Sequence, residues 1–253
     1  MKSIMKTIMK TRMNEMKAMG IAGMSLFVWQ GLQAQTAPGI ETSLIRVEQG
    51  TFDSHQMLMG RKLPPEGTRG DYYLNDQWQE GFITLKSGQT FQKYPLKYDI
   101  ENDMLEIRAG DEVKILRGER VASFTWKEAV SQQEDRYINS HDYRLEGTPL
   151  IGFFQVLVEG KVMLFSRMEA QVKEPTYVQG LDVGKRYSEV VKKEVFYLSD
   201  EHKSLRQVSS KKDVWEFVGQ QQGQVKQYMK DQKLSVTHKQ DLSLIVSFIN
   251  QLL

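Results

Sequence analysis

Apolar and polar residues alternate along most of the chain between Leu44 and Ser209, with turn-forming residues about every ten positions. A period of two places successive side chains on opposite faces of a β-strand. In the clearest case, residues 153–158 and 161–166 are strongly apolar and flank Glu159-Gly160. Two turn residues ending in glycine between β-prone runs predict a tight antiparallel hairpin.

The same pattern predicts further hairpins. Ser87-Gly88 separates residues 82–86 from 89–94, Gly110-Asp111 separates 104–108 from 113–116, and a polar turn separates 194–198 from 205–208. Pro95 cannot donate to a strand ladder, so the strand around it should be an edge strand or be bulged there. Residues 61–69 and 170–188 carry the weakest pattern and are predicted to be long loops, the second of which could mark a subdomain boundary.

From Ser210 onward the period lengthens to about 3.6, as in helices. Ser210 with Asp213 is expected to begin a first helix that Gly219 ends, and residues 225–229 mark a second. Thr237 and Gln240 form a capping-box pattern for a third helix. The apolar stripe of this third helix consists of Leu242, Ile245, Phe248, Ile249 and Leu252.

These patterns predict an α+β fold, mainly antiparallel β, arranged as a sandwich or barrel-like meander with a short C-terminal helical segment. The expected division is a β-rich domain over residues 36–209 and a helical segment over residues 210–253 that packs on it. Three short helices are not stable alone, so they must pack on the sheet or on a partner.

Residues 1–35 have the order of a secretory signal peptide. Five basic residues and one acid within residues 2–17 precede a 12-residue uncharged apolar run at 18–29 and then small and polar residues. The apolar run is shorter than the ~20 residues of a membrane span. An uncleaved amphipathic anchor and a mitochondrial presequence compete with this interpretation, and Met13, Met16 and Met19 are alternative start sites. The signal predicts an exported protein, periplasmic or at the cell surface, whose mature chain begins near Ala37.

Charge and composition exclude several classes of function. The chain of 253 residues has 34 basic and 32 acidic residues, so its net charge is +2, and removing residues 1–35 leaves 218 residues with a net charge of −2. This balance argues against a nucleic-acid partner. Without cysteine there is no disulfide, thiolate zinc site, catalytic thiol or lipid-anchoring cysteine. No cofactor or metal is predicted, because the four histidines form no local metal motif and no nucleotide-binding or nucleophile motif is present.

The most distinctive segment of the mature chain runs over residues 71–81 and mixes aromatic side chains with acids. Aromatic faces beside carboxylates and amides suit sugar or peptide ligands. The competing interpretation is a loop that Tyr73 and Trp78 anchor in the core. The candidate ligand-binding residues of this segment are Asp71, Tyr73, Asp76, Trp78 and Glu80.

Two other charged groups invite a functional interpretation. Asp99, Glu101 and Asp103 alternate as in an oxygen-ligand calcium loop, but a solvated turn between two strands explains them more simply. The basic residues near 185–193 are interleaved with Glu189 and Glu194, as expected for a solvated strand end rather than an anion site.

Short motifs along the mature chain carry a family resemblance. In the β-rich part they are Gly70, Tyr73-Leu74-Asn75, Trp78, Gly81, Leu85, Gly88 and Pro95-Leu96-Lys97-Tyr98-Asp99. In the tail they are Lys211-Lys212-Asp213, Phe217, Val225-Lys226, Tyr228, Lys233-Leu234-Ser235 and Phe248-Ile249-Asn250. With these motifs the chain resembles uncharacterised secreted β-rich proteins of Bacteroidota. The resemblance spans most of the mature chain and implies export and a shared fold, but it implies no reaction and no catalytic residue.

Three functions fit the sequence. The first is a non-enzymatic structural or ligand-binding protein of the envelope, whose partner could be a glycan, a lipid or a protein. The second is a carbohydrate- or peptidoglycan-acting hydrolase with a carboxylate pair that only the fold brings together. The third is a protein–protein interaction module that uses Leu242, Ile245 and Ile249 as its contact stripe. Burial of that stripe on the sheet would make it core.

Overall fold

The computed structural model describes residues 61–127 and 133–253, all of which belong to one compact unit. The predicted signal peptide, residues 1–35, lies outside the described residues. The described strands are β1 (Gln79–Leu85), β2 (Thr90–Asp99), β3 (Met104–Ala109), β4 (Glu112–Arg117), β5 (Val121–Lys127), β6 (Glu134–Asn139), β7 (Arg144–Leu145), β8 (Thr148–Pro149), β9 (Phe153–Val158), β10 (Met163–Lys173), β11 (Glu189–Ser199) and β12 (Ser204–Val208).

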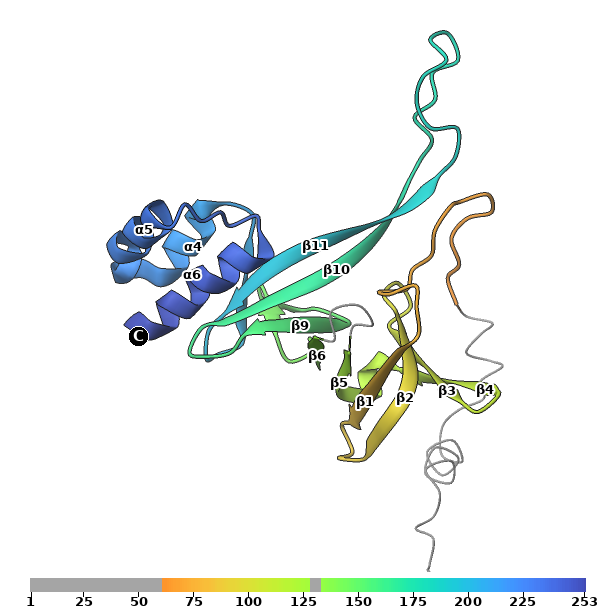
Figure 1. The fold of residues 1–253 in the computed structure, drawn as a ribbon, viewed down its shortest axis with the longest axis horizontal. Helices are drawn as coiled ribbons and strands as arrows, with labels where there is room; N and C mark the ends of the chain where they lie inside the picture. Colours follow the sequence, from red (N-terminus) through yellow and green to blue (C-terminus); the bar gives the residue numbers. More distant parts are fainter. Residues whose placement is uncertain (1–60, 128–132) are drawn as a thin grey trace, which may run out of the picture. The chain divides into compact units, whose positions relative to one another are not determined.

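All twelve strands form one open sheet, in the order β4-β3-β2-β1-β5-β6-β9-β10-β11-β12-β7-β8 (Figure 1). Sequence neighbours are mostly sheet neighbours, and each pair of strands is antiparallel except β12 with β7. Within residues 61–127 and 133–253, helices follow at the C-terminal end, apart from the short 3-10 turn η1 (Gly118–Arg120). The α+β fold class, mainly antiparallel β with a C-terminal helical segment, is therefore confirmed.

The predicted hairpins are present. Gly88, between β1 and β2, adopts a φ of +87°, a conformation that favours glycine. The extra residue of a β-bulge lies at Lys93, since Tyr94 pairs with Gly81 while Gln92 pairs with Phe82. The prediction of an edge or a bulge around Pro95 is thus met by a bulge two residues earlier.

The hairpin of β10 and β11 is longer than the pattern predicts. The two strands pair over eleven positions, from Met163 with Ser199 to Lys173 with Glu189, so residues 170–173 and 189–193 are strand and only 174–188 connect them. In the outer half both faces carry charged residues, such as Glu169 opposite Lys193. In this outer half the apolar alternation is therefore lost while the backbone pairing continues. Residues 174–188 connect two neighbouring strands of one sheet.

Three hydrophobic clusters stabilise the sheet. One fills the face formed by β1–β6 and β9, a second lies between the sheet and the helices, and a third covers the opposite face of β9–β12. Adjacent residues of β10 belong to different clusters, because Leu164 contacts the helical side while Phe165 faces away from it. Successive strand residues thus alternate between faces, as the sequence period requires.

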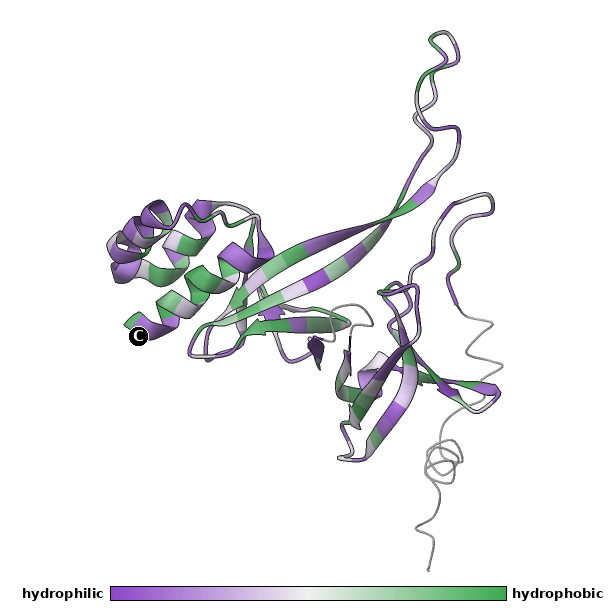
Figure 2. Ribbon diagram, in the orientation of Figure 1, coloured by the Kyte–Doolittle hydropathy of each residue, from purple (hydrophilic) through white to green (hydrophobic). Residues whose placement is uncertain are grey.

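The helices are α4 (Lys211–Val218), α5 (Gln222–Asp231) and α6 (Lys239–Leu252), with a 3-10 turn η2 (Gly219–Gln221) between the first two. α6 packs on β9 and β10, and α4 packs on β12. Figure 2 shows a largely hydrophobic α6 and a mostly hydrophilic α5. Leu242, Ile245 and Ile249 are fully buried, so the apolar stripe is core and is not an exposed contact surface.

The helix starts follow from their capping residues. Ser210 and Asp213 form the predicted capping box of α4, and Gly219 is its C-cap with a φ of +55°. The capping box expected from Thr237 and Gln240 is wrong by one residue, because α6 begins after His238.

The acid in the first turn of α6 explains that shift. Asp241 accepts a 3.0 Å hydrogen bond from the backbone N–H of Ser235 and thereby ties the helix start to the preceding turn. The helix start places Lys239 at the first helical position.

Candidate functional site

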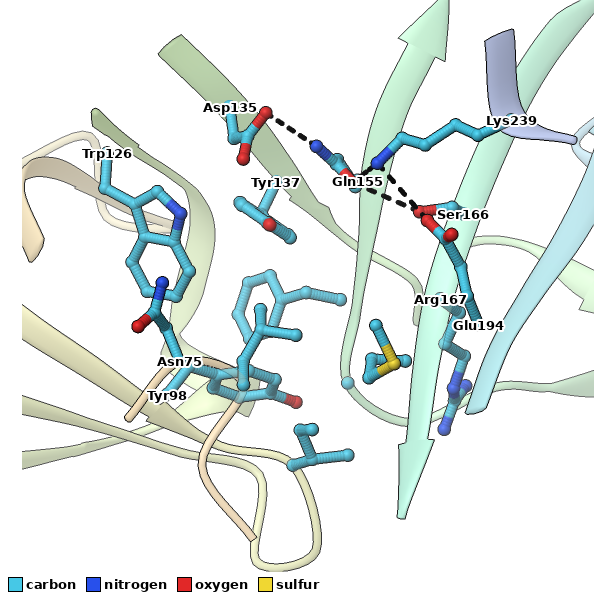
Figure 3. A pocket seen from close by; sticks show the side chains of 15 residues that line it. Asn75, Tyr98, Trp126, Asp135, Tyr137, Gln155, Ser166, Arg167, Glu194 and Lys239 are labelled. Carbon is cyan, nitrogen blue, oxygen red and sulfur yellow. Dashed lines mark hydrogen bonds and ion pairs between the residues drawn. The ribbon is translucent and has the colours of Figure 1, made fainter. Parts of the chain in front are cut away.

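A cavity of about 240 Å³ lies between the face of the first strands and the β10–β11 hairpin (Figure 3). It combines residues from β2, β5, β6, β9, β10 and β11 with one residue from the start of α6. Its lining consists of Leu74, Asn75, Tyr98, Ile100, Trp126, Asp135, Tyr137, Gly152, Phe153, Gln155, Ser166, Arg167, Met168, Glu194 and Lys239. Segments that are distant in sequence therefore meet in one place.

Strand register explains which side chains reach the cavity. Phe124 on β5 pairs with Tyr137 on β6, Tyr137 with Gln155 on β9, Gln155 with Ser166 on β10, and Ser166 with Phe196 on β11. Paired residues of adjacent strands point to the same face, so these five form one row across the sheet. The row changes from aromatic to polar at Gln155 and then to the small Ser166, which leaves space above the sheet.

Aromatic side chains form one wall of the cavity. Tyr98 packs edge-on against Phe153, with 5.2 Å between ring centroids, and Trp126 packs edge-on against Tyr137 at 5.1 Å. All four rings are buried. Because these rings are held by one another, their positions are fixed before any ligand arrives.

A chain of hydrogen bonds forms the opposite wall. The Gln155 amide donates to Asp135 Oδ1 at 2.7 Å, and its carbonyl accepts from Lys239 Nζ at 2.7 Å and from the Ser166 hydroxyl at 3.2 Å. Lys239 also pairs with Glu194 at 3.2 Å. Gln155 is thus the centre of the polar wall, and the first turn of α6 completes it (Figure 3).

At another end of the cavity the hydroxyl of a buried tyrosine meets a half-buried carboxylate. The Tyr98 hydroxyl donates a 2.9 Å hydrogen bond to Asp103 Oδ1. Burial, together with the Asp103 charge, holds the pKa of Tyr98 well above its usual range. Burial likewise raises the pKa of Asp103, although the Tyr98 hydrogen bond and the charge of Arg167 oppose the shift.

The chemistry of the cavity follows from the groups that line it. Among residues 61–127 and 133–253, no group of three His, Asp or Glu side chains could hold a metal ion. His141, His202 and His238 are exposed, and His55 is outside the described residues. The cavity instead presents fixed rings, amides, carboxylates and cations, which can hold hydroxyl groups and apolar ring faces.

The three acids predicted as ligand-binding residues do not line this cavity. Asp71 and Asp76 both approach Lys192 on β11, at 3.3 and 3.0 Å. Asp71 also accepts a hydrogen bond from the Tyr73 backbone N–H and so orders the turn. Glu80 is exposed on β1. Asp71 and Asp76 therefore serve a surface contact between the 71–78 segment and β11.

The two predicted aromatic residues lie outside the cavity as well. The Tyr73 hydroxyl donates to Glu106 at 2.7 Å and accepts from Arg61 at 2.8 Å. Burial and the hydrogen bond to Glu106 raise the pKa of Tyr73 to about 12. The guanidinium of Arg108 lies over the Trp78 ring, 4.3 Å from its centroid. Both rings are half-buried, and each lies against a cation of the fold rather than in the cavity.

The predicted segment nevertheless reaches the cavity through two other residues. Leu74 and Asn75 line it, between Tyr73 and Asp76. The structure thus brings this loop to the cavity through residues other than the five candidates, whose ligand-binding role stays a prediction. Gln155 did leave a signal that could have been used: it is the one polar residue within the apolar run of residues 153–158.

The remaining charged motifs are engaged in local contacts. Asp99 is buried and pairs with Arg61 at 2.7 Å, so it belongs to an internal ion pair rather than to a calcium loop. In the basic cluster, Lys185 pairs with Glu189 and Arg186 pairs with Asp182. These are short-range ion pairs of a solvated strand end.

Comparison with known proteins adds no relative. No protein-family model matches this chain, and no match is found among curated proteins or among solved structures. Within the described residues, no helix has both the length and the apolar character required to cross a membrane.

Proposed function

We propose that this protein is exported and acts as a non-enzymatic binding protein of the periplasm or cell surface, with the cavity as its ligand site. The ligand is a compact, hydroxyl-rich molecule such as a single sugar unit. One observation carries this proposal: a wall of fixed aromatic rings faces a wall of hydrogen-bonding groups centred on Gln155. A sugar ring has the matching chemistry, because it combines apolar C–H faces with a rim of hydroxyl groups.

The size of the cavity supports a small ligand. Its 240 Å³ corresponds to about eight water molecules at ~30 Å³ each. Pockets for drug-sized ligands have about 300–1,000 Å³. One ring, or one unit of a longer chain, is the fitting occupant, whereas a buried oligosaccharide or an acyl chain is too large.

Export and family membership are supported by the sequence. The basic segment, apolar run and small-residue exit of residues 1–35 carry the export proposal. The motifs shared with secreted proteins of Bacteroidota agree with it. N-terminal sequencing of protein recovered from the producing cells is expected to begin at or near Ala37, and a chain that still begins at Met1 would contradict export.

Calorimetric titration with D-glucose, D-galactose and N-acetyl-D-glucosamine tests the binding site. We expect saturable binding of at least one sugar, weakened about tenfold or more in Gln155→Leu, since one hydrogen bond of ~1.4 kcal/mol corresponds to a factor of ten. Gln227→Leu is the matched control, because Gln227 is exposed on α5 and contacts only Asp231. Absence of binding to every sugar, with circular dichroism showing a folded protein, would overturn the proposal.

A hydrolase is the second candidate, because Asp135 and Glu194 both line the cavity. The fold brings these two carboxylates together from positions far apart in sequence, as glycoside hydrolysis requires. Gln155 holds the first and Lys239 holds the second. Release of nitrophenolate from nitrophenyl glycosides by the wild type, lost in Asp135→Asn and in Glu194→Gln, would support an enzyme. If the wild type releases no nitrophenolate, the hydrolase candidate fails and the binding role is the one that remains.

A further inference from the structure

Arg167 on β10 is a cation of the cavity lining that lacks a partner. Its Nη1 atom is buried and has no hydrogen-bond partner among residues 61–127 and 133–253. No carboxylate of the described residues forms an ion pair with its guanidinium. By contrast, Arg61 bonds Asp99, Glu106 and Tyr73. Burial of a guanidinium nitrogen without an acceptor is unfavourable, so a structure that retains it calls for an explanation.

The charged groups around Arg167 do not satisfy it. Asp103 lies close enough for the positive charge of Arg167 to oppose its pKa shift, but Asp103 accepts its hydrogen bond from the Tyr98 hydroxyl. On the neighbouring strand, the Tyr197 hydroxyl is directed to Glu169 at 3.5 Å. Both carboxylates thus accept from a tyrosine, and neither of them bonds Arg167 Nη1, which keeps a free donor.

The backbone at Gly152 brings two polar groups of the cavity lining close together. Gly152 has a φ of +110°, a conformation that favours glycine. A Cβ atom at Gly152 would lie 2.9 Å from the Tyr98 hydroxyl and 3.9 Å from Arg167 Nη2. The Tyr98 hydroxyl and the Arg167 guanidinium thus both lie close to Gly152, and a larger residue there would clash with the hydroxyl.

We infer that Arg167 anchors an anionic group of the ligand, and that the ligand of the proposed site is an acidic sugar whose carboxylate it binds. A guanidinium binds a carboxylate through two parallel N–H···O bonds, which gives both affinity and orientation. The aromatic wall would hold the ring face, and the Gln155 wall would hold the hydroxyl groups. This inference rests on the proposed binding function and adds the charge of the ligand to it.

The test compares D-glucuronate with D-glucose, which differ only in the carboxylate at C6, by calorimetric titration at low ionic strength. We expect glucuronate to bind the wild type about tenfold or more tightly than glucose, the ratio typical of one charge-assisted pair. In Arg167→Met this preference should disappear while glucose binding changes less than threefold. Arg167→Lys should keep part of the preference, because it retains the charge and loses the paired geometry.

Arg206→Met is the control, since Arg206 is exposed and pairs only with Glu216. It should leave the preference for glucuronate unchanged. The melting temperature of Arg167→Met without ligand should equal or exceed that of the wild type, because the substitution removes a half-buried cation whose buried Nη1 atom has no hydrogen-bond partner. A clear drop in melting temperature would show that Arg167 has a structural partner and would contradict its role as a free anchor.

The outcomes separate the two proposals. If glucose and glucuronate bind equally well, the anionic anchor is refuted and the binding site stands. If the preference survives in Arg167→Met, another cation such as Lys239 holds the carboxylate and the inference is refuted. If neither compound nor any neutral sugar binds, the proposed function fails and the inference fails with it.

Discussion

Replacing Gln155 by leucine tests whether the polar wall holds the cavity together. The substitution keeps a side chain of similar size on β9 and removes every hydrogen bond of the amide. The lost bonds are those to Asp135 at 2.7 Å, to Lys239 at 2.7 Å and to Ser166 at 3.2 Å. Gln155 is only 8% exposed, so water cannot replace these partners freely.

The expected loss follows from the character of each bond. A hydrogen bond to a charged group contributes ~1.5–3 kcal/mol and a neutral one ~0.5–1.5 kcal/mol. Lys239 is 39% exposed, so solvent screening reduces its contact to below ~1 kcal/mol. The leucine regains part of the loss through apolar burial at ~25 cal/mol per Å². We therefore expect Gln155→Leu to lower the free energy of unfolding by about 1–3 kcal/mol, which lowers the melting temperature by about 2–12 °C in a domain of this size.

Urea unfolding followed by circular dichroism measures this loss, with Gln227→Leu as the matched control. A double-mutant cycle with Lys239→Met should give a coupling energy of ~0.5–1 kcal/mol, since the two side chains share one hydrogen bond. If Gln155→Leu is as stable as Gln227→Leu and shows no coupling to Lys239, the hydrogen-bonded wall does not exist in solution and the description of the site is wrong.

Three further substitutions, two of them paired with a control substitution, test the fold and its pH dependence. Burial raises the pKa of Asp103, so its contribution to stability is present below the unfolded-state pKa and is lost as pH rises through the folded-state pKa. Asp103→Asn should therefore be at least as stable as the wild type at pH 7, and the difference should vanish in acid. Urea unfolding at both pH values measures the two free energies. Ile249→Ala should lower the free energy of unfolding by about 2–5 kcal/mol, because this side chain of α6 is fully buried. Leu244→Ala, on the exposed face of α6, should lower it by less than ~0.5 kcal/mol. Equal losses would contradict the assignment of the apolar stripe to the core. Gly81→Ala should cost more than ~3 kcal/mol of stability, because its Cβ would lie 2.2 Å from a backbone carbonyl of β5. Gly110→Ala has free space for its Cβ and should cost only ~1 kcal/mol of backbone strain. Thermal unfolding of the two variants compares these losses.

Local patterns predicted the hairpins and the first helix well. Glu159-Gly160 and Ser87-Gly88 lie at turns between strands that pair as expected, because turn chemistry and apolar alternation are local properties. The outer half of the β10–β11 hairpin was missed, since its strands have polar residues on both faces and backbone pairing alone extends them. α6 begins one residue later than the capping-box pattern predicted, and Asp241 in its first turn bonds the backbone N–H of Ser235 in the preceding turn.

The site was harder to predict than the fold because it is assembled across the sheet. Gln155 and Ser166 become neighbours through strand register, and Lys239 joins them only when α6 packs on β9 and β10. No spacing in the sequence encodes these contacts. The segment around Asn75 was recognised from its composition, but its conspicuous aromatic and acidic side chains point to other partners.

The most direct test of the ligand site is a ¹H–¹⁵N NMR titration of the folded protein with D-glucuronate, observed at side-chain amide groups. The amides of Asn75 and Gln155 line the cavity, whereas Gln227 lies on the exposed face of α5. The account predicts saturable shifts for Asn75 and Gln155 and none for Gln227. A binding role for the cavity would be contradicted if the chemical shifts of Asn75 and Gln155 stay unchanged at high ligand concentration. It would also be contradicted if all three amides shift equally without saturating.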